Sequence, residues 1–477
     1  MSHEDPGPRL GGTLLRPPSH RWYGVDLHVR GCPPVAVGMP VQVRLGLAAL
    51  ADGLGERGPV DARALRLCRV DAGGRETEMP WQFTPAPAPR HPERRLRVGT
   101  HPTVSWVAEW GAEEEAPPNL GTEGLLTFTV GEGPTPAASY RLEFGVPRSG
   151  KVVQVPFPPG NLHCFDVQGN PTPVRWFPEM RVHPHWPHDG TVHFVQGRDP
   201  VASYHLGPSL PGDPPHRPYF YPVLGPDGIP LTDLGKPHDP TGSHAHHYSL
   251  WIAHASVSGA DFWSERGGSI CHQGVEEAED GPLFCRLVQS LCWIAGGQTL
   301  LRERRTAVVH RTREAYRVLD LDLQLSAAGT APVELGQTTF GPVAVRAAQS
   351  MTVFDGGGVV QNAEGRRNEE GAHRQRSRWI DQSGPVAPDR WAGIALMDHP
   401  DNPGHPTWWH CRNDGWAGAS LTLAGPRTIA PDHTLHLRYR VVLHRGDALD
   451  GEVEQRYREF ACAPTVELGV VRRLDGS

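Results

Sequence analysis

Strict alternation of apolar and polar residues is the clearest pattern along the chain. Between residues 319 and 325, leucine occupies every second position, and Asp320, Asp322 and Gln324 fill the positions between them. A period of two places all the leucines on one face of a β-strand, which predicts a sheet with one buried face. Residues 435–443 and 140–146 alternate in a similar way. These segments predict antiparallel sheets.

One segment follows the helical period instead. Val453, Tyr457 and Phe460 recur at the spacing that puts side chains on one face of a helix. We therefore expect a helix over residues 451–461 that covers the last strand. Glycine and proline number 55 and 49, which is typical of short strands joined by many turns. The sequence predicts an all-β fold.

The length of 477 residues suggests about two or three domains. A strand-rich unit ends at SYRLEFGV, and the segments PRSGK and VPFPPGN that follow it mark a boundary near residue 150. We expect an N-terminal domain over residues 1–148, a linker over 149–195 and a main domain with the site over 196–477.

The composition limits the classes of partner and ligand that we expect the protein to bind. Lysine plus arginine total 46 against 53 acidic residues, a net charge of −7, and no long basic run predicts nucleic-acid binding. The lysines are Lys151 and Lys236, so arginine is the expected ligand for anionic groups. The eight cysteines form no CxxC pair. Because no signal peptide and no apolar run of about 18 residues occur, we expect a soluble, cytoplasmic protein without a membrane partner.

Histidine and aromatic residues gather in three segments, at residues 217–228, 243–263 and 393–416. Imidazole titrates near neutral pH and both donates and accepts hydrogen bonds, so such a cluster suits acid–base chemistry. Flat aromatic faces suit sugar rings. The alternative is that Trp251 and His254 are core residues of a strand and that the preceding histidines form only a polar loop.

Together these segments resemble a bacterial family that carries the label methane oxygenase PmoA, over about residues 190–448. The matching segments are RPYFYPVLGPDG (217–228), SHAHHYSLWIAHASVSGADFW (243–263), QNAEG (361–365), RWIDQSG (378–384) and GIALMDHPDNPGHPTWWHCR (393–412). The chain departs from the family pattern where Ser243 replaces an aspartate and Tyr248 replaces an arginine. A membrane oxygenase subunit needs spanning segments, so the label does not describe this chain.

The resemblance implies an antiparallel β-sandwich of the supersandwich kind, as in sugar mutarotases and polysaccharide lyases, and a role in bacterial carbohydrate metabolism. The N-terminal unit is similar to the accessory β-sandwich domains that precede the catalytic domains of polysaccharide-degrading enzymes. A small-molecule carbohydrate is the expected substrate. The expected catalytic residues are His246, His247, His254, His399, His410, Asp261 and Asp398. The expected substrate-binding residues are Arg217, Tyr219, Trp251, Trp263, Trp379, Asp381, Trp409 and Arg412.

A conventional glycosidase uses two facing carboxylates, for which Asp261, Asp381 and Asp398 are candidates. Histidine outnumbers carboxylate in these segments. This favours a hydrolase or lyase that cleaves a glycoside, or a 3-keto-glycoside, by histidine-centred proton transfer. A non-catalytic carbohydrate-binding protein and a mutarotase-like isomerase stay open. No cofactor is identified, and a divalent metal stays open with His244 and His246 as candidate ligands.

Overall fold

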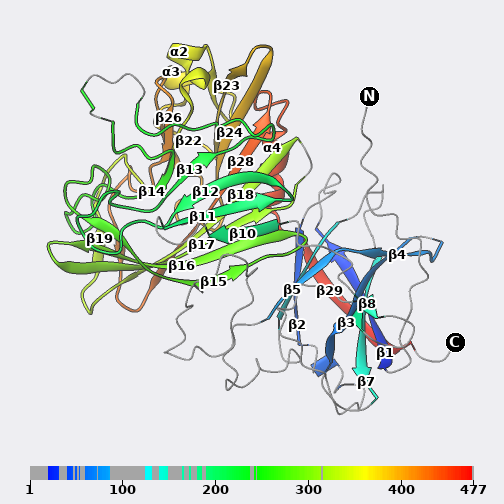
Figure 1. The fold of residues 1–477 in the computed structure, drawn as a ribbon. Coiled ribbons are helices and arrows are strands. Elements are labelled where there is room, and N and C mark those ends of the chain that lie inside the picture. The colour runs from blue at the N-terminus through cyan, green and yellow to red at the C-terminus, as the bar shows by residue number, and fades with distance from the viewer. Residues whose placement is uncertain are drawn as a thin grey trace.

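A computed structural model of the protein describes residues 20–31, 40–46, 49–50, 53, 60–71, 73–85, 124–130, 139–148, 164–165, 171–172, 180–184, 190–236, 241–242, 244–312 and 315–474. Figure 1 shows a large strand-rich unit and a smaller one beside it, and the first and last described strands both lie in the smaller unit. Strands dominate both units, which confirms the all-β fold.

The larger unit is built on two antiparallel sheets. The nine-stranded sheet runs in the order β10 (Met180–Pro184), β11 (Thr191–Gln196), β12 (Asp199–His205), β13 (Tyr219–Val223), β14 (Leu250–Ile252), β20 (Val343–Arg346), β26 (Trp416–Ala419), β25 (Trp408–Cys411) and β22 (Gln375–Arg376). The eight-stranded sheet runs in the order β15 (Ser269–Glu279), β16 (Phe284–Ala295), β17 (Gln298–His310), β18 (Tyr316–Ala327), β28 (Thr434–Arg445), β24 (Arg390–Asp398), β23 (Trp379–Ala387) and β21 (Val359–Asn362).

Shorter elements lie along the chain between the strands of the larger sheets. They are the strand pairs β19 (Val333–Leu335) with β27 (Arg427–Ile429) and β8 (Cys164–Phe165) with β9 (Pro171–Thr172), and the helices η1 (Gln349–Met351), α2 (Val353–Gly356), α3 (Asn368–Ala372) and α4 (Val453–Ala461).

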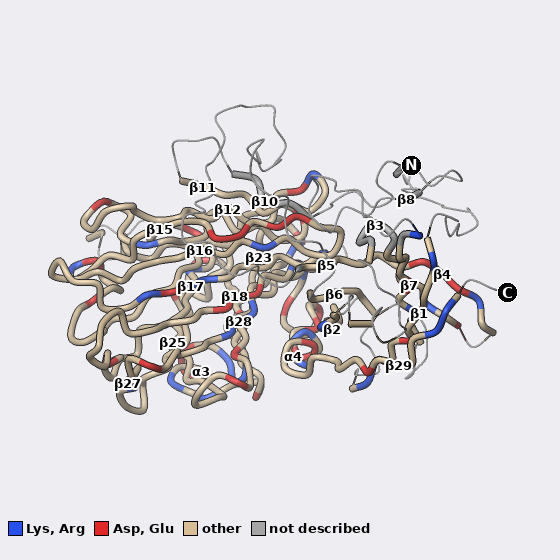
Figure 2. Tube along the Cα trace, turned by 90° about the horizontal axis from the view of Figure 1, so that it is seen from below, with Lys and Arg blue, Asp and Glu red and all other residues tan. Residues whose placement is uncertain are grey.

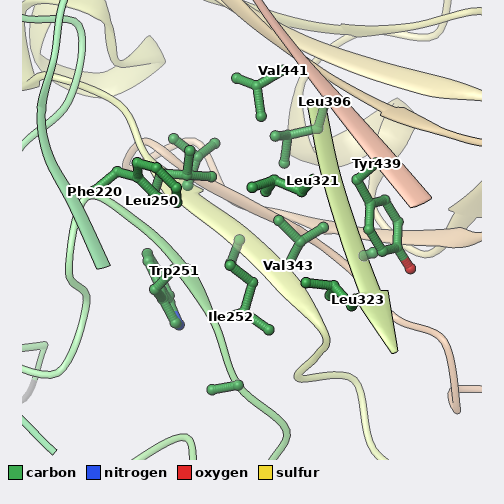
Figure 3. Packing of buried hydrophobic residues seen from close by; sticks show 14 of the residues in the cluster. Phe220, Leu250, Trp251, Ile252, Leu321, Leu323, Val343, Leu396, Tyr439 and Val441 are labelled. Carbon is green, nitrogen blue, oxygen red and sulfur yellow. The ribbon is translucent and has the colours of Figure 1, made fainter. Parts of the chain in front are cut away.

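The two large sheets pack face to face and form a sandwich. Leu250 and Ile252 of β14 belong to the same buried cluster as Leu321, Leu396 and Val441 of the other sheet, and Figure 3 shows these side chains between the strands. Burying each such side chain stabilises the fold by roughly 1.5–3 kcal/mol. The alternation expected at residues 319–325 and 435–443 is confirmed, because β18 and β28 bury their apolar faces here.

The helix expected near residue 453 is also confirmed, as α4. Val453, Tyr457 and Phe460 are buried, and they pack with Met397 and Val442 in a second cluster. Met397 and Val442 lie one residue away from core residues on their strands, so they point to the opposite face of the sheet. The helix therefore covers the outer face of the eight-stranded sheet.

Cross-strand ion pairs also lie on the strands of this sheet. Arg440 of β28 holds Asp320 of β18 through two hydrogen bonds, of 2.7 and 2.8 Å. Arg304 of β17 holds Glu276 of β15 at 2.8 Å. Basic and acidic residues accordingly lie close together along this sheet, as the blue and red segments of Figure 2 show.

The smaller unit contains a five-stranded and a three-stranded antiparallel sheet. Their orders are β29 (Thr465–Arg473), β1 (His20–Arg30), β7 (Ser139–Pro147), β3 (Asp61–Val70) and β4 (Glu76–Met79), and β2 (Pro40–Leu45), β6 (Gly124–Thr129) and β5 (Trp81–Pro85). The strand expected at residues 140–146 is confirmed as β7. Its alternate residues join one core with side chains of the second sheet, among them Val41, Phe83 and Phe128.

Two of the expected domain boundaries are wrong. Strands β10 and β11 belong to the nine-stranded sheet, so the main unit begins before residue 196. Strand β29 pairs with β1, so the chain returns to the smaller unit at its end, visible in Figure 1 as a red strand among blue ones. Sequence proximity could not reveal this pairing, because the register that joins Val25 to Val471 links opposite ends of the chain.

The two units meet at a polar contact. Gln82 of β5 is fully buried, and its amide donates to the Glu279 carboxylate at 2.8 Å. Its carbonyl oxygen accepts the Phe284 N–H at 3.3 Å. Thr84 also donates to Glu279, at 2.7 Å. The end of the β15–β16 hairpin is therefore fastened to the smaller unit.

A buried ion pair connects β28 to β23. His444 Nε2 lies 2.8 Å from the Asp381 carboxylate, and both side chains are 0% exposed. His444 Nδ1 donates to the Arg445 carbonyl at 3.1 Å, and Ser383 donates to Asp381. Burial disfavours the imidazolium, but the Asp381 carboxylate and the hydrogen bond to the Arg445 carbonyl outweigh it and raise the pKa of His444 above its ordinary value.

Asp381→Asn leaves the imidazolium without a counter-charge, so we expect the free energy of unfolding to fall by about 3–5 kcal/mol at about pH 6. A raised histidine pKa contributes stability in full below 6.5, the ordinary value, and that contribution is lost as the pH rises through the folded-state pKa. The difference between wild type and variant in urea denaturation should therefore shrink towards about pH 9.

Asp322→Asn is the matched control, because it breaks a half-exposed pair with His436 and should cost less than about 1 kcal/mol. Equal losses in the two variants, or a loss at position 381 that grows with pH, would contradict the assignment.

Candidate functional site

A pocket of about 770 Å³ lies between residues of β25 and β26 and the segments on either side of β14. It is lined by Lys236, His244, His246, His247, Ala255, Asp261, Trp263, Ser264, Thr338, Phe340, Phe354, Glu369, His410, Arg412, Asp414 and Trp416. Its main walls are a histidine loop, defined here as residues 244–247, and an opposite loop, residues 412–415, between β25 and β26. The volume suits a small-molecule ligand.

The histidine loop is fastened from below by a buried arginine. Arg217 is fully buried and donates to the carbonyl oxygens of His246, Phe262 and Trp263. Burial lowers the pKa of Arg217 to about 10, although Glu265 acts in the opposite direction. Arg217 therefore joins the histidine loop to the segment that carries Trp263, and its guanidinium binds backbone and not a ligand.

Aromatic rings form the apolar wall of the pocket. Trp416 stacks on His410 with ring centroids 4.2 Å apart, and on Phe340 at 5.9 Å. Trp263 lies 5.8 Å from Trp416, and His247 lies 5.4 Å from it. A mostly apolar wall with a few polar groups is typical of a small-molecule site.

Three of the histidines on the pocket wall, His246, His247 and His410, are uncharged at neutral pH. Burial, and then the charge of Arg217, lowers the pKa of His246 to about 4. Burial, and then His373, lowers the pKa of His410 to about 3. Burial, and then Arg346, holds the pKa of His247 far below its ordinary value. A neutral imidazole offers one hydrogen-bond donor and one acceptor.

The hydrogen bonds of these three rings differ. Nδ1 of His247 lies 2.6 Å from a guanidinium nitrogen of Arg346. Nδ1 of His410 shares a hydrogen bond with the Thr339 hydroxyl. Within the described part of the chain, the ring nitrogens of His246 make no hydrogen bond, so they can exchange a proton with a ligand.

Each carboxylate on the pocket wall already has partners. Asp414 pairs with Lys236 at 3.0 Å, and Glu369 pairs with Arg412 at 2.9 Å. Asp261 accepts the backbone N–H groups of the two residues at 263 and 264, at 2.7 and 3.0 Å. The acidic groups are thus used in ion pairs and in shaping the loop.

The structure brings seven of the expected residues together on the pocket wall. They are His244, His246, His247, His410, Asp261, Trp263 and Arg412. The other expected residues do not line this pocket, and each occupies another place in the sandwich.

Two of them lie directly behind the pocket. Trp251 is fully buried and stacks beneath His247 at 5.2 Å. His254 is buried, with Nε2 3.0 Å from the Thr422 hydroxyl and Nδ1 accepting the Ser256 N–H at 3.1 Å. Both nitrogens of His254 are therefore satisfied inside the protein.

Tyr219 belongs to a stack of rings on β13. It lies 4.3 Å from the His205 ring and 4.9 Å from the Tyr248 ring. Trp409 of β25 is fully buried, and its indole N–H donates to the Ser377 carbonyl at 2.8 Å. Neither side chain reaches the pocket.

Three others lie near α4. Trp379 is buried in the cluster that packs against the helix. His399 meets the Phe460 ring edge-on at 4.8 Å. Asp398 is 1% exposed and accepts hydrogen bonds from the loop at 402–407 that follows it. Asp381, the remaining residue, is the buried partner of His444.

Several pocket residues lie outside the expected set. They are Lys236, Ala255, Ser264, Thr338, Phe340, Phe354, Glu369, Asp414 and Trp416. Most of them come from segments without a histidine cluster. Lys236 could have been noticed from the sequence, because lysine is rare in this chain. Phe354 could not, because no sequence pattern reveals that this apolar side chain at the pocket mouth is 69% exposed.

Among the residues that the structure describes, those on the pocket wall do not form a three-ligand metal set. Among the described residues, the set of three side chains with suitably converging donor atoms is Cys68, Glu76 and Glu143, in the smaller unit. Burial raises the pKa of Cys68 to about 12, which keeps it a thiol. The candidate ligands His244 and His246 belong to no such set.

Comparison with known families identifies the family to which the larger unit belongs. Residues 191–458 match DUF6807, a family of unknown function. The chain belongs to this family. The DUF6807 match covers the sandwich except for β10, and it includes every residue of the pocket wall.

Solved structures give weaker likenesses. A mutant of the heparan sulfate lyase HepC from Pedobacter heparinus is 9% identical, with 59% of this chain and 38% of that chain covered and a TM-score of 0.32. The unsubstituted HepC is 8% identical, with 54% and 36% covered and a TM-score of 0.30. The DUF6807 chain thus spans less than two fifths of the length of these structures, and the likeness is too low to inform function.

No curated protein matches the sequence. Within the described residues, no helix has both the length and the apolar character needed to cross a membrane.

His246 should titrate well below the ordinary histidine pKa. In NMR spectra of protein labelled at histidine, we expect the His246 ring to gain its proton near pH 4, because burial and Arg217 oppose the charge. The His246→Gln variant identifies the signal. In the urea-unfolded chain the same ring should titrate near about 6.5. A folded-state midpoint at that ordinary value would show that the ring is not held in the pocket wall.

Proposed function

We propose that the pocket is the active site of a carbohydrate-active enzyme, a hydrolase or lyase that cleaves a glycoside or a 3-keto-glycoside by histidine-centred proton transfer. One observation carries the proposal: neutral histidines line the same pocket as a wall of stacked aromatic rings. The rings provide apolar faces for a sugar, and the imidazoles exchange protons with it.

The carboxylates support this choice of chemistry. A conventional glycosidase needs one carboxyl group as acid and another as base or nucleophile, on opposite sides of the bond. Here Asp414 and Glu369 are held by Lys236 and Arg412, and Asp261 caps a loop. Imidazoles are the groups left to move protons.

His246 is the proposed base, because its ring nitrogens have no hydrogen-bonding partner in the described chain. On a 3-keto-glycoside it takes the proton from the carbon between the keto group and the anomeric carbon. The electron pair forms a carbon–carbon double bond, and the bond from the anomeric carbon to the leaving oxygen breaks. The leaving oxygen takes up one proton, so atoms and charge balance without an oxidant. Addition of water to the double bond would complete a hydrolysis.

The low pKa of His246 helps the second half of this cycle. A group that binds its proton weakly when buried is a strong acid once protonated, so it passes the proton on to the leaving oxygen readily. His410 is the second candidate for proton transfer, because its neutral ring lines the same wall.

The test is mass-spectrometric screening of a panel of glycosides and their 3-keto forms. We expect a cleaved product, and in His246→Gln a fall in kcat of about 100-fold or more, the usual contribution of a general acid–base residue. His433→Gln is the control, because that histidine is 76% exposed and does not line the pocket. It should keep the wild-type rate.

Wild-type rates in both His246→Gln and His410→Gln would refute the histidine mechanism. Tight sugar binding without any change of mass would favour the carbohydrate-binding or mutarotase alternatives. The cytoplasmic location and the accessory role of the smaller unit stay predictions, as does the PmoA resemblance.

A further inference from the structure

Arg346 lies at the junction of the two loops that form the pocket. It ends β20, which is paired with β14 on one side and with β26 on the other, where Arg346 lies opposite Trp416. The side chain is 1% exposed. One guanidinium nitrogen donates to the Asp414 carbonyl at 2.6 Å, and another lies 2.6 Å from His247 Nδ1. A single cation therefore contacts both loops from beneath.

This contact fixes the position of the His247 proton. A guanidinium has only N–H donors and never accepts a hydrogen bond. His247 Nδ1 must therefore accept, so a neutral ring carries its proton on Nε2. A proton on Nδ1 would place two N–H groups against each other and would put a second positive charge beside Arg346.

The other nitrogen, Nε2, remains available to a ligand. His247 lines the pocket, and within the described chain Nε2 makes no hydrogen bond. The ring cannot rotate freely, because it stacks on Trp251 beneath it at 5.2 Å and meets His246 edge-on at 4.6 Å. The N–H group is held in place before any ligand binds.

We propose that His247 is a fixed hydrogen-bond donor of the site, whose Nε2–H binds an oxygen of the sugar, and that Arg346 is the positioning residue that holds it in this form. This inference rests on the proposed function and assigns different chemical roles to two neighbouring histidines. His247 donates to an oxygen, and His246 takes the proton. A histidine locked in this way is not the base.

A fixed N–H donor at His247 beside a base at His246 favours a substrate oxygen that accepts a hydrogen bond and gains negative charge. A keto oxygen next to the abstracted proton has both properties, because it becomes an enolate oxygen in the transition state. A preorganised N–H donor in a partly buried site stabilises that charge. The favoured substrate class is therefore a sugar with a carbonyl group beside the carbon that loses its proton.

The first test needs no substrate. In protein labelled with ¹⁵N at histidine, the His247 signals, identified by loss in His247→Gln, should show a bare Nδ1 and a protonated Nε2. A proton on Nδ1 overturns the proposal, even if the enzyme cleaves glycosides.

The second test uses the sugar that gives product in the screen or, if none does, each sugar of the panel as a probe. We expect its addition to shift the Nε2–H signal of His247. An unmoved signal when a sugar binds in the pocket overturns the donor role. Absence of any sugar binding overturns it together with the proposed function.

Arg346→Met tests the positioning role. Without the donor, His247 should divide between its two neutral forms, and kcat should fall by about 100-fold or more, as for a lost oxyanion donor. Arg346→Lys should restore most of the rate and the wild-type tautomer, because lysine also only donates.

Arg456→Met is the matched control, since Arg456 is also a buried, ion-paired arginine but lies on α4. It should lower thermal stability without changing the His247 signals. If Arg346→Met also leaves those signals unchanged, Arg346 does not position the ring.

Discussion

The contacts of one buried guanidinium determine the geometry of the pocket. Arg346 binds a ring nitrogen of His247 in one loop and the backbone of Asp414 in the other. Burying a cation costs several kcal/mol, and charged hydrogen bonds of about 1.5–3 kcal/mol each offset that cost only when the partners are in place. The two loops are therefore coupled through Arg346, and the pocket walls depend on it.

The sandwich provides the frame for this interaction. Strand β20 lies inside the nine-stranded sheet, between β14 and β26, so the backbone of Arg346 is fixed from both sides. The loops that Arg346 contacts are therefore held in a fixed position as well. Arg217 has a similar role below the histidine loop, where its buried guanidinium donates to three backbone carbonyl oxygens. Burial, together with the charges of these two arginines, keeps His246 and His247 uncharged.

Much of the fold could be predicted from the sequence, because the strands at 319–325 and 435–443 have one apolar face and one polar face. The pairing of β1 with β29 could not, because it joins opposite ends of the chain. At the site, the His/Trp-rich segments indicated where the loops meet. They could not distinguish His246, which lines the pocket, from His254, whose nitrogens are both bonded inside the protein. Residues such as Asp414 and Phe340 can be recognised as part of the pocket wall only once the structure brings the loops together.

The most direct test of this account is a crystal structure of the protein with a bound glycoside or 3-keto-glycoside. We expect the sugar between the histidine loop and Trp416, with one of its oxygens about 3 Å from His247 Nε2 and accepting a hydrogen bond from it. A sugar bound outside the pocket, or one whose hydroxyl donates to His247 Nε2 as an acceptor, would contradict the account.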